Sequence, residues 1–181
     1  KRILKILDRD PKLLPFKIST LISEISLAKN LRLTPDEYIN RFGGQDSSVG
    51  FNQNIYEMYE QYENELKQCN ALDFDDLLLK TVILLEKHEE TRRNCEDQFK
   101  YLLVDEFQDT NRLQFDIATY LTKENRNLFV VGDPDQSIYS WRHADPNNVM
   151  DFNNIFTDSK VIKLDQNYRS TKSILSAADA L

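Results

Sequence analysis

The chain has 181 residues, 40% of them hydrophobic, and a formal net charge of −7 at pH 7. That length can bury one sizeable core or two small ones. The acidic balance argues against a protein that holds nucleic acid on a broad basic face, so any such contact must use a local groove and base stacking. No apolar run is long enough to span a membrane. The spacing of Cys69 and Cys95 fits no zinc site and favours a reducing compartment.

The first 98 residues are predicted to form a helical subdomain. Residues 1–10 already show a helical apolar pattern and lack an initiator Met, which suggests a piece of a longer protein. Pro35 is expected to begin a helix, Asp73 is expected to cap another, and residues 41–50 are expected to form a loop. A helix is predicted from apolar residues at helical spacing, namely Ile18, Leu21, Ile22, Ile25 and Ala28. A later amphipathic segment carries Ile55, Tyr59, Tyr62 and Leu66 on one stripe, and this tyrosine stripe is predicted to be core rather than a binding surface.

From residue 99 the pattern changes to short apolar runs that alternate with helical stretches. This alternation is typical of an α/β domain with a buried parallel sheet. The predicted strands are 101–104, 128–131 and 161–164, and the predicted helices are 112–123, 146–156 and 170–181.

Each predicted strand runs directly into a polar cluster. The clusters begin at Asp105, Gly132 and Asp165. Because the carboxyl ends of parallel strands share one edge, where open α/β proteins bind ligands, we expect the three clusters to converge on one site.

The first cluster places Asp105 and Glu106 at the end of a hydrophobic strand, as in the Walker B arrangement of nucleotide hydrolases. Asp105 would hold Mg²⁺, and Glu106 would orient and deprotonate the attacking water. The pair alone is also compatible with a strand that ends in solvated acids.

The second cluster begins with a turn at 132–134 that lets the backbone approach a neighbour closely. The amide of Gln136 could then touch a γ-phosphate or the attacking water. Tyr139, Trp141 and Arg142 have the aromatic and cationic character that stacks single-stranded bases. The alternative is that the aromatics are core residues, against which their polar neighbours argue.

In the third cluster, Arg169 is placed like an arginine finger that stabilises charge on a transferring phosphoryl group. Tyr168 could stack on a base. An arginine at a strand end can equally be a salt-bridge partner.

These motifs carry a resemblance that covers nearly the whole chain. Residues 104–110 (VDEFQDT), 130–142 (VVGDPDQSIYSWR) and 164–171 (LDQNYRST) are similar to motifs II, III and IV of UvrD/PcrA/Rep superfamily 1 DNA helicases, in that order. Residues 25–35 and 72–78 resemble the helical 1B subdomain of the family and its junction with subdomain 1A. The resemblance implies a 1B-like subdomain over 1–98 and an incomplete RecA-like, P-loop NTPase-like 1A domain over 99–181.

The resemblance also implies the roles of the site residues. Asp105 and Glu106 would serve Mg²⁺ and water activation, Gln136 and Arg169 would sense the γ-phosphate of ATP, and Tyr168 would stack on adenine. Single-stranded DNA would lie against the residues of the second motif, namely Tyr139, Trp141 and Arg142. The family implies 3′ to 5′ movement, single-strand/duplex junctions as substrates, and repair or replication proteins as partners. It implies a cytoplasmic, nucleoid-associated protein in a bacterium or a nuclear or organellar one in a eukaryote. The sequence sets no oligomeric state.

Two departures from the family pattern stand out. His143 occupies a position where the family usually has glycine, which puts DNA contacts near that turn in doubt. No GxxxxGK(S/T) motif occurs anywhere in the chain, so the phosphate cradle and its lysine are missing. We therefore expect the 181 residues alone to hydrolyse ATP negligibly and not to unwind duplex DNA.

Three alternatives stay open from the sequence. One is the helicase subunit of a recombination helicase-nuclease of the AddA/RecB kind. Another is a metal-dependent nuclease built on Asp105, Glu106, Asp109 and Asp133. The last is a nucleic-acid-binding module without catalysis.

Overall fold

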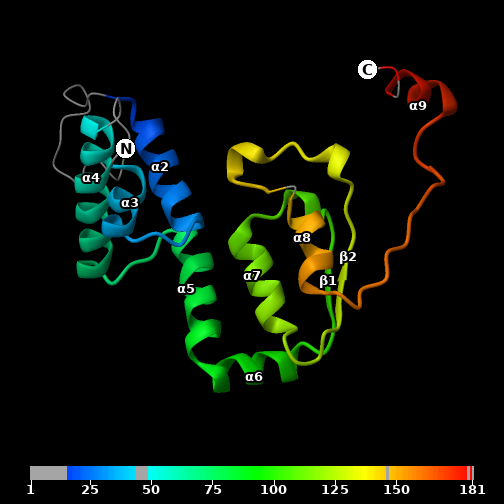
Figure 1. Cartoon of the computed structure of the whole chain (residues 1–181), viewed down its shortest axis with the longest axis horizontal. Helices are drawn as coiled ribbons and strands as arrows, with labels where there is room; N and C mark the ends of the chain where they lie inside the picture. The colour runs from blue at the N-terminus through cyan, green and yellow to red at the C-terminus, as the bar shows by residue number, and fades with distance from the viewer. Residues whose placement is uncertain (1–15, 44–48, 146, 179, 181) are drawn as a thin grey trace. The chain divides into compact units, whose positions relative to one another are not determined.

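A computed structural model describes residues 16–43, 49–145, 147–178 and 180 (Figure 1). Contacts divide the chain into two units, 1–150 and 151–181. The subdomain boundary expected after residue 98 stays a prediction. The helix expected within residues 1–10, and residues 44–48 of the loop expected at 41–50, lie outside the described residues. The prediction of a loop is wrong for residues 41–42 and 49–50, which belong to helices.

The first unit is mainly helical and carries one small sheet. Its helices and strands run in the following order: α2 (Ile18–Asn30), α3 (Pro35–Phe42), α4 (Val49–Gln68), α5 (Phe74–Lys87), α6 (Glu89–Gln98), β1 (Leu102–Val104), α7 (Arg112–Leu121) and β2 (Leu128–Val130). Three single 3₁₀ turns follow the strands: η2 (Phe107–Asp109), η3 (Pro134–Gln136) and η4 (Ser140–Arg142). Helix α8 (Asn147–Ile155) crosses from the first unit into the second, which also contains α9 (Lys172–Ala178).

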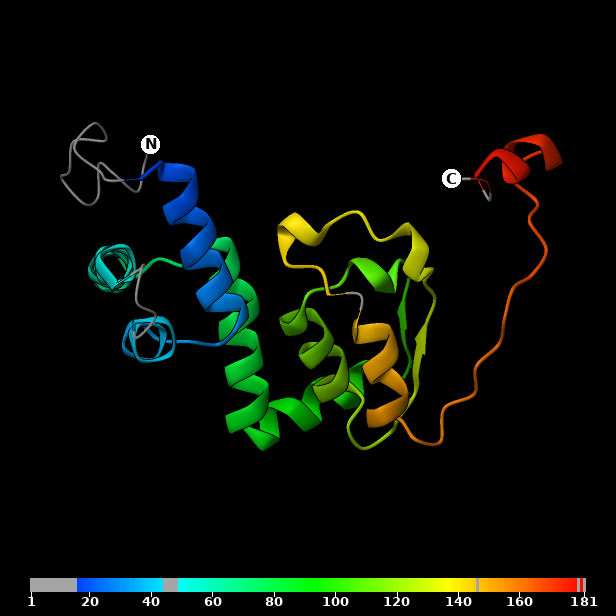
Figure 2. The same ribbon diagram turned by 45° about the horizontal axis from the view of Figure 1, so that its top comes forward.

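Helices α2, α3 and α4 share one hydrophobic core, and the two views of the ribbon agree on their packing (Figures 1 and 2). The predicted helix and the tyrosine stripe of α4 both supply this core, and the tyrosine stripe is buried as predicted. Ile22 lies outside the core, because its side chain is exposed. It follows Leu21 and so lies about 100° around the helix from that buried residue. The buried core side chains are Leu21, Ile25, Ala28, Tyr38, Ile55, Met58, Tyr59 and Tyr62.

Two helix starts are confirmed by capping boxes. Pro35 begins α3, and the hydroxyl of Thr34 accepts the backbone N–H of Glu37. Asp73 caps α5 by accepting the backbone N–H of Asp76 at 2.7 Å. Such caps satisfy N–H groups that have no partner in the first turn of a helix.

A buried lysine joins α2 to α4 and α5. The Nζ of Lys29, with its side chain 1% exposed, lies 2.7 Å from a carboxylate oxygen of Glu63, 2.7 Å from one of Asp73 and 3.1 Å from one of Asp76. Tyr62 donates its hydroxyl to the same Asp73 oxygen at 3.0 Å. Burial alone would lower the pKa of Lys29, but its hydrogen bonds to Asp73 and Glu63 raise that pKa above its usual value.

The sheet is parallel, with Leu103 opposite Phe129, and both strands form within the predicted runs. Leu103 is 71% exposed and Phe129 56% exposed, so the prediction of a fully buried sheet is wrong. Successive side chains of a strand point to opposite faces, and the face that carries these two is left open by the described residues.

The prediction of a third strand at 161–164 is also wrong. The side chains of Val161, Ile162 and Leu164 are exposed, and no strand is assigned within the described part of 151–181. A lone extended segment leaves its backbone N–H and C=O groups without a ladder partner, so the apolar run alone does not make a strand.

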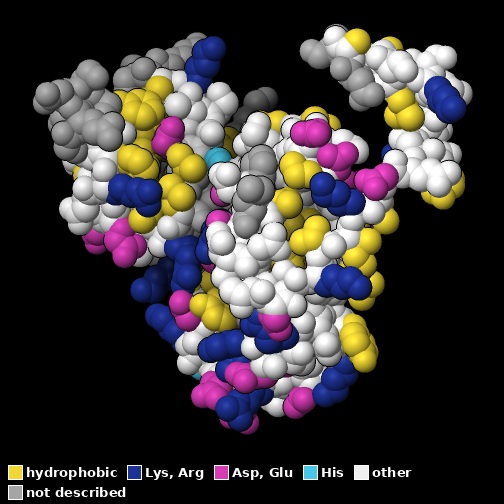
Figure 3. Space-filling view, turned by 45° about the vertical axis from the view of Figure 1, so that its right-hand side comes forward, with side chains coloured by type: hydrophobic (Ala, Val, Ile, Leu, Met, Phe, Trp, Pro, Cys, Tyr) yellow, Lys and Arg dark blue, Asp and Glu magenta, His cyan; other side chains and the backbone are white. Residues whose placement is uncertain are grey.

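Surface charges of both signs are interleaved where α6 lies, on the face shown in Figure 3. Ion pairs account for much of this pattern, for example Arg93 with Glu89 at 2.5 Å and Lys100 with Asp97 at 3.0 Å. Within the described ranges, no helix combines the length and the apolar composition that crossing a bilayer requires.

Candidate functional site

The loop after β1 exposes two neighbouring acids. Asp105 and Glu106 follow the strand directly, and Oδ1 of Asp105 accepts the backbone N–H of Glu106 at 3.0 Å. Glu106 has a φ of 51°, in the left-handed region that residues other than glycine rarely adopt. The buried ring of Phe107 anchors the turn that follows by packing edge-on against Phe115 of α7, with ring centroids 5.5 Å apart. Glu106 therefore sits in a sharp, anchored turn at the sheet edge.

The loop after β2 folds around Asp133. One carboxylate oxygen of Asp133 accepts the backbone N–H of Asp135 at 3.0 Å, and the other accepts Nε2 of Gln136 at 2.6 Å. The amide of Gln136 is thus held within its own loop, and its side chain is exposed.

The two loops leave the same edge of the sheet side by side. Val131 donates its N–H to the carbonyl of Val104 at 2.9 Å, and Phe107 donates its N–H to the carbonyl of Val131 at 2.9 Å. Backbone pairing therefore continues past the ends of both strands. The structure brings the first two predicted clusters together, as parallel pairing led us to expect.

A side chain that was not predicted links these loops. Gln108 is 0% exposed, its Nε2 donates to Oε2 of Glu106 at 2.8 Å, and its Oε1 accepts the N–H of Asp133 at 2.9 Å. A Cβ at Gly132 would lie 2.7 Å from that Oε1. Gly132 therefore permits the close backbone approach that the sequence predicted, and the partner is Gln108.

The donor set at this edge fits Mg²⁺ rather than a metal caged by protein. Among the residues that the structure describes, no group of three or more acidic, His or Cys side chains is placed to hold a metal. The ligand set that a nuclease built on Asp105, Glu106, Asp109 and Asp133 would need is thus not assembled there. Mg²⁺ commonly takes only one or two carboxylates and keeps water and phosphate ligands, and exposed Asp105 can supply one of them.

Beyond η3 the chain presents an aromatic and cationic group to solvent. The guanidinium of Arg142 lies 4.4 Å from the centroid of the Trp141 ring and 5.6 Å from that of Tyr139. Trp141 is 66% exposed. The alternative that these aromatics are core residues is wrong. His143 has a φ of 62°, in the left-handed region that glycine adopts without steric cost.

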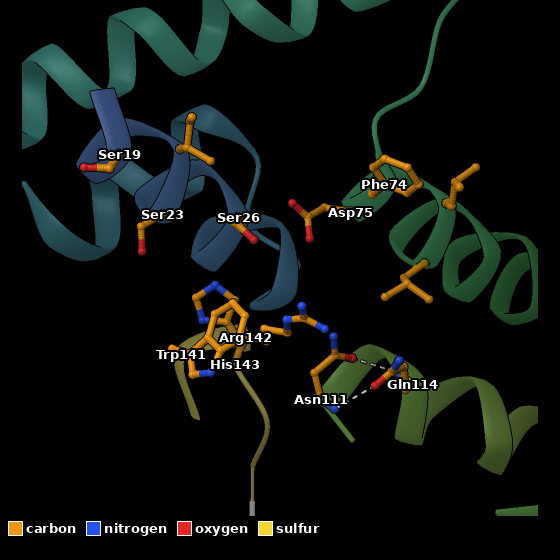
Figure 4. A pocket seen from close by; sticks show the side chains of 13 residues that line it. Ser19, Ser23, Ser26, Phe74, Asp75, Asn111, Gln114, Trp141, Arg142 and His143 are labelled. Atoms are coloured by element: carbon orange, nitrogen blue, oxygen red, sulfur yellow. Dashed lines mark hydrogen bonds between the residues drawn. The ribbon is translucent and has the colours of Figure 1, made fainter. Parts of the chain in front are cut away.

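Residues 141–143 form one wall of a pocket of about 710 Å³ within the first unit (Figure 4). The opposite wall is α2, whose Ser19, Ser23 and Ser26 share one helix face at spacings of four and three residues. Helix α5 contributes Phe74, which is 89% exposed. The remaining lining residues are Ile22, Asp75, Leu77, Leu78, Asn111 and Gln114.

The pocket therefore combines hydroxyl groups, exposed aromatic rings and an arginine. One acid also lies on its wall: burial raises the pKa of the Asp75 carboxyl above its usual value. An array of hydroxyls, π-faces and a guanidinium suits a flexible polyanion whose bases can stack.

Sequence reasoning missed three features of this region. Phe74 was treated only as part of the helix that Asp73 caps, and no local pattern indicated that its ring is exposed. The serine spacing on α2 was a detectable signal. The burial of Gln108 had no local signal, because it follows from the pairing of two distant loops.

The third cluster lies in the second unit, and its convergence with the other two clusters stays a prediction. Oδ1 of Asn167 accepts the backbone N–H groups of Arg169 and Ser170, both at 2.9 Å, which makes a local turn. The side chain of Tyr168 is 87% exposed. The roles expected of Tyr168 and Arg169 stay predictions.

Comparison with known proteins gives a consistent family. Residues 1–157 match the UvrD/REP helicase N-terminal domain. The chain is 43% identical to ATP-dependent DNA helicase Rep of Escherichia coli K12, with all of this chain and 26% of that protein covered. It is 39% identical to ATP-dependent DNA helicase PcrA of Leuconostoc citreum over 100% of this chain and 23% of the relative. For PcrA of Bacillus subtilis the identity is 41%, over 99% of this chain and 23% of the relative.

The chain thus spans about a quarter of the length of these relatives. The family match covers most of its residues, including the loops after β1 and β2 and the pocket beside them. This chain belongs to the UvrD/REP helicase family.

Proposed function

We propose that this chain supplies part of the ATP-hydrolysis site and part of the single-strand path of a 3′ to 5′ DNA helicase. The observation that carries the proposal is the parallel pairing of β1 and β2, which delivers the acids at 105–106 and the loop at 132–142 to one sheet edge. In the proposal, the open face with Leu103 and Phe129 belongs to a larger RecA-like sheet.

The chemistry assigned to the first loop is hydrolysis of the terminal phosphate. Mg²⁺ held by Asp105 would neutralise charge that develops on the phosphate oxygens. Glu106 takes the proton of the attacking water through its exposed carboxylate. The chain has no GxxxxGK(S/T) motif, so the proposal places the phosphate cradle in residues other than these.

Contacts with the nucleotide are assigned to side chains at two other places. Gln136 would contact the γ-phosphate, so the position of the loop after β2 would depend on whether that phosphate is bound. Arg169 would stabilise charge on that phosphate, and Tyr168 would stack on adenine. The exposure of all three side chains leaves them accessible to a nucleotide.

The strand path is assigned to the pocket. A base would stack on Trp141 or Phe74, both of which are exposed on its lining. Arg142 and the serine hydroxyls of α2 would contact phosphates, which positions a strand without reading its sequence. The local pocket resolves the difficulty posed by the net charge of −7, since it needs no broad basic surface. Duplex junctions and repair or replication partners remain part of this proposal.

The test is steady-state ATP hydrolysis by a full-length protein carrying these 181 residues, with and without single-stranded DNA. We expect hydrolysis that single-stranded DNA stimulates, and unwinding of a duplex with a 3′ tail. Hydrolysis that is indifferent to DNA would overturn the proposal.

A further inference from the structure

The side chain of Gln108 is fully buried and polar. It bridges the loop after β1 and the loop after β2, and both of these loops reach the surface. Its Nε2 donates to the carboxylate of Glu106 at 2.8 Å, and its Oε1 accepts the backbone N–H of Asp133 at 2.9 Å. Only one orientation of the amide satisfies both neighbours. The reverse orientation would set an oxygen against a carboxylate and an NH₂ group against an N–H donor.

The surroundings fix Gln108 from the backbone side as well. Its own carbonyl accepts the hydroxyl of Ser137 at 3.4 Å, from the loop after β2. The absent Cβ at Gly132 leaves room for its Oε1, since that carbon would come within 2.7 Å. The amide is therefore wedged between the loops and cannot relax towards water without separating them.

The bridge extends further into the second loop. The carboxylate of Asp133 accepts Nε2 of Gln136 at 2.6 Å. Hydrogen bonds thus connect Glu106 to Gln108, Gln108 to Asp133, and Asp133 to Gln136. The same loop continues to Trp141. A change in the position of this loop would reach the Glu106 carboxylate through one amide.

We infer that Gln108 is a positioning residue, which aims the Glu106 carboxylate and couples that aim to the position of the loop at 132–137. The inference rests on the proposed function, in which Glu106 takes the proton of the attacking water. Gln108 itself touches neither water nor nucleotide in this scheme. Correct orientation of a reacting group can be worth about 10²-fold in rate, so loss of the bridge should act on turnover rather than on binding.

Two substitutions in the full-length helicase distinguish the hydrogen bond of Gln108 to Glu106 from its hydrogen bond to Asp133. Gln108→Glu keeps an acceptor for the N–H of Asp133 and replaces the donor to Glu106 with a second carboxylate. Gln108→Met keeps the length of the side chain and removes both hydrogen bonds. Asn52→Leu is the matched control, because Asn52 is a buried amide that donates to the carbonyl of Phe42 in the helical core, away from both loops.

At pH 8 and saturating single-stranded DNA, we expect both Gln108 variants to lower kcat by about 10²-fold. The KM for ATP and the Kd for DNA should stay at wild-type values, and Asn52→Leu should leave kcat unchanged. If both Gln108 variants keep the kcat of the control, or if their KM and Kd rise in parallel with the loss of kcat, the positioning role is refuted.

A second readout needs no turnover. In the full-length helicase, hydrogen exchange of the Asp133 amide should be faster in Gln108→Met than in wild type and unchanged in Gln108→Glu. Equal exchange in all three would show that the bridge does not hold the loop, and would overturn the inference. Its failure is distinct from that of the proposed function: a wild-type enzyme without DNA-stimulated hydrolysis refutes the latter, whereas an active wild type with unaffected Gln108 variants refutes only the inference.

Discussion

Trp141 is the single tryptophan of the chain and lies on the pocket wall, so its fluorescence reports directly on the proposed strand path. Stacking of a base on the indole should quench this fluorescence when oligo-dT is added. We expect binding to weaken with salt, because Arg142 contacts phosphate in the proposal.

The matching substitution is Trp141→Ala, measured by anisotropy of a labelled oligonucleotide. Loss of one stacking platform should weaken binding by about 1–3 kcal/mol. Tyr101→Ala is the control, since Tyr101 is also an exposed aromatic but does not line the pocket. Equal affinity of both variants and wild type would remove Trp141 from the strand path.

Substitution of Lys29 tests how much its buried ion pairs contribute to the free energy of unfolding. Lys29→Met leaves Glu63, Asp73 and Asp76 without their shared cation, and breaking a buried pair costs about 3–5 kcal/mol. The lower end is expected because the side chains of Glu63 and Asp73 are 26% and 20% exposed. Urea unfolding followed by circular dichroism measures the change.

The control for this prediction is Lys80→Met. Lys80 lies 4.0 Å from Asp76 and its side chain is half exposed, so its removal should change the free energy of unfolding by less than about 0.5 kcal/mol. Similar losses of unfolding free energy in both variants would mean that the buried ion pairs of Lys29 stabilise the fold no more than the exposed pair of Lys80.

Asp73 caps helix α5 and also pairs with Lys29. The free energy of unfolding should therefore depend on pH. Burial would raise the pKa of Asp73, but hydrogen bonds from Lys29 and the Asp76 backbone lower it below its usual 3.8. The folded pKa is depressed, so the stabilisation is present above pH 3.8 and is lost as pH falls through the lower folded value. The folded pKa of Lys29 is raised, so its contribution is present below pH 10.5 and is lost as pH rises through the higher folded value.

The measurement is the difference in unfolding free energy between wild type and Lys29→Met as a function of pH. It should form a plateau between those limits and fall away on both sides. A difference that stays constant down to about pH 2, which is about two pH units below the ordinary aspartate pKa, would contradict the assignment.

Helices were predictable from the sequence where local chemistry decides them. Thr34, which precedes Pro35, and Asp73 mark helix starts through side-chain caps that need only the next three residues. The absence of a strand at 161–164 was not predictable in the same way, because a strand requires a partner that an apolar run does not specify.

The site was predictable to the extent that it follows from strand direction. Parallel pairing of two strands was enough to bring Asp105 and Glu106 beside the loop of Gln136. The linking role of Gln108 could not be found, because its burial arises only when Gly132 and Asp133 pack against it. Roles at Tyr168 and Arg169 depend on how distant parts of a motor meet, which no local pattern encodes.

For the molecule as a whole, the chain alone should hydrolyse ATP negligibly, since it contains no phosphate-binding GxxxxGK(S/T) motif. A malachite-green assay with and without oligo-dT measures this. DNA-stimulated turnover by the 181 residues themselves would contradict the proposal that the phosphate cradle lies in other residues.

The central claim is that one edge of the small sheet performs hydrolysis while the loop beside it holds the DNA strand. The most direct test is Glu106→Gln in the full-length helicase, with ATP turnover and DNA affinity measured on the same preparation. The account predicts that turnover falls by about 10²–10⁴-fold, as for loss of a general base, while the Kd for single-stranded DNA is unchanged. Turnover at the wild-type rate would contradict it.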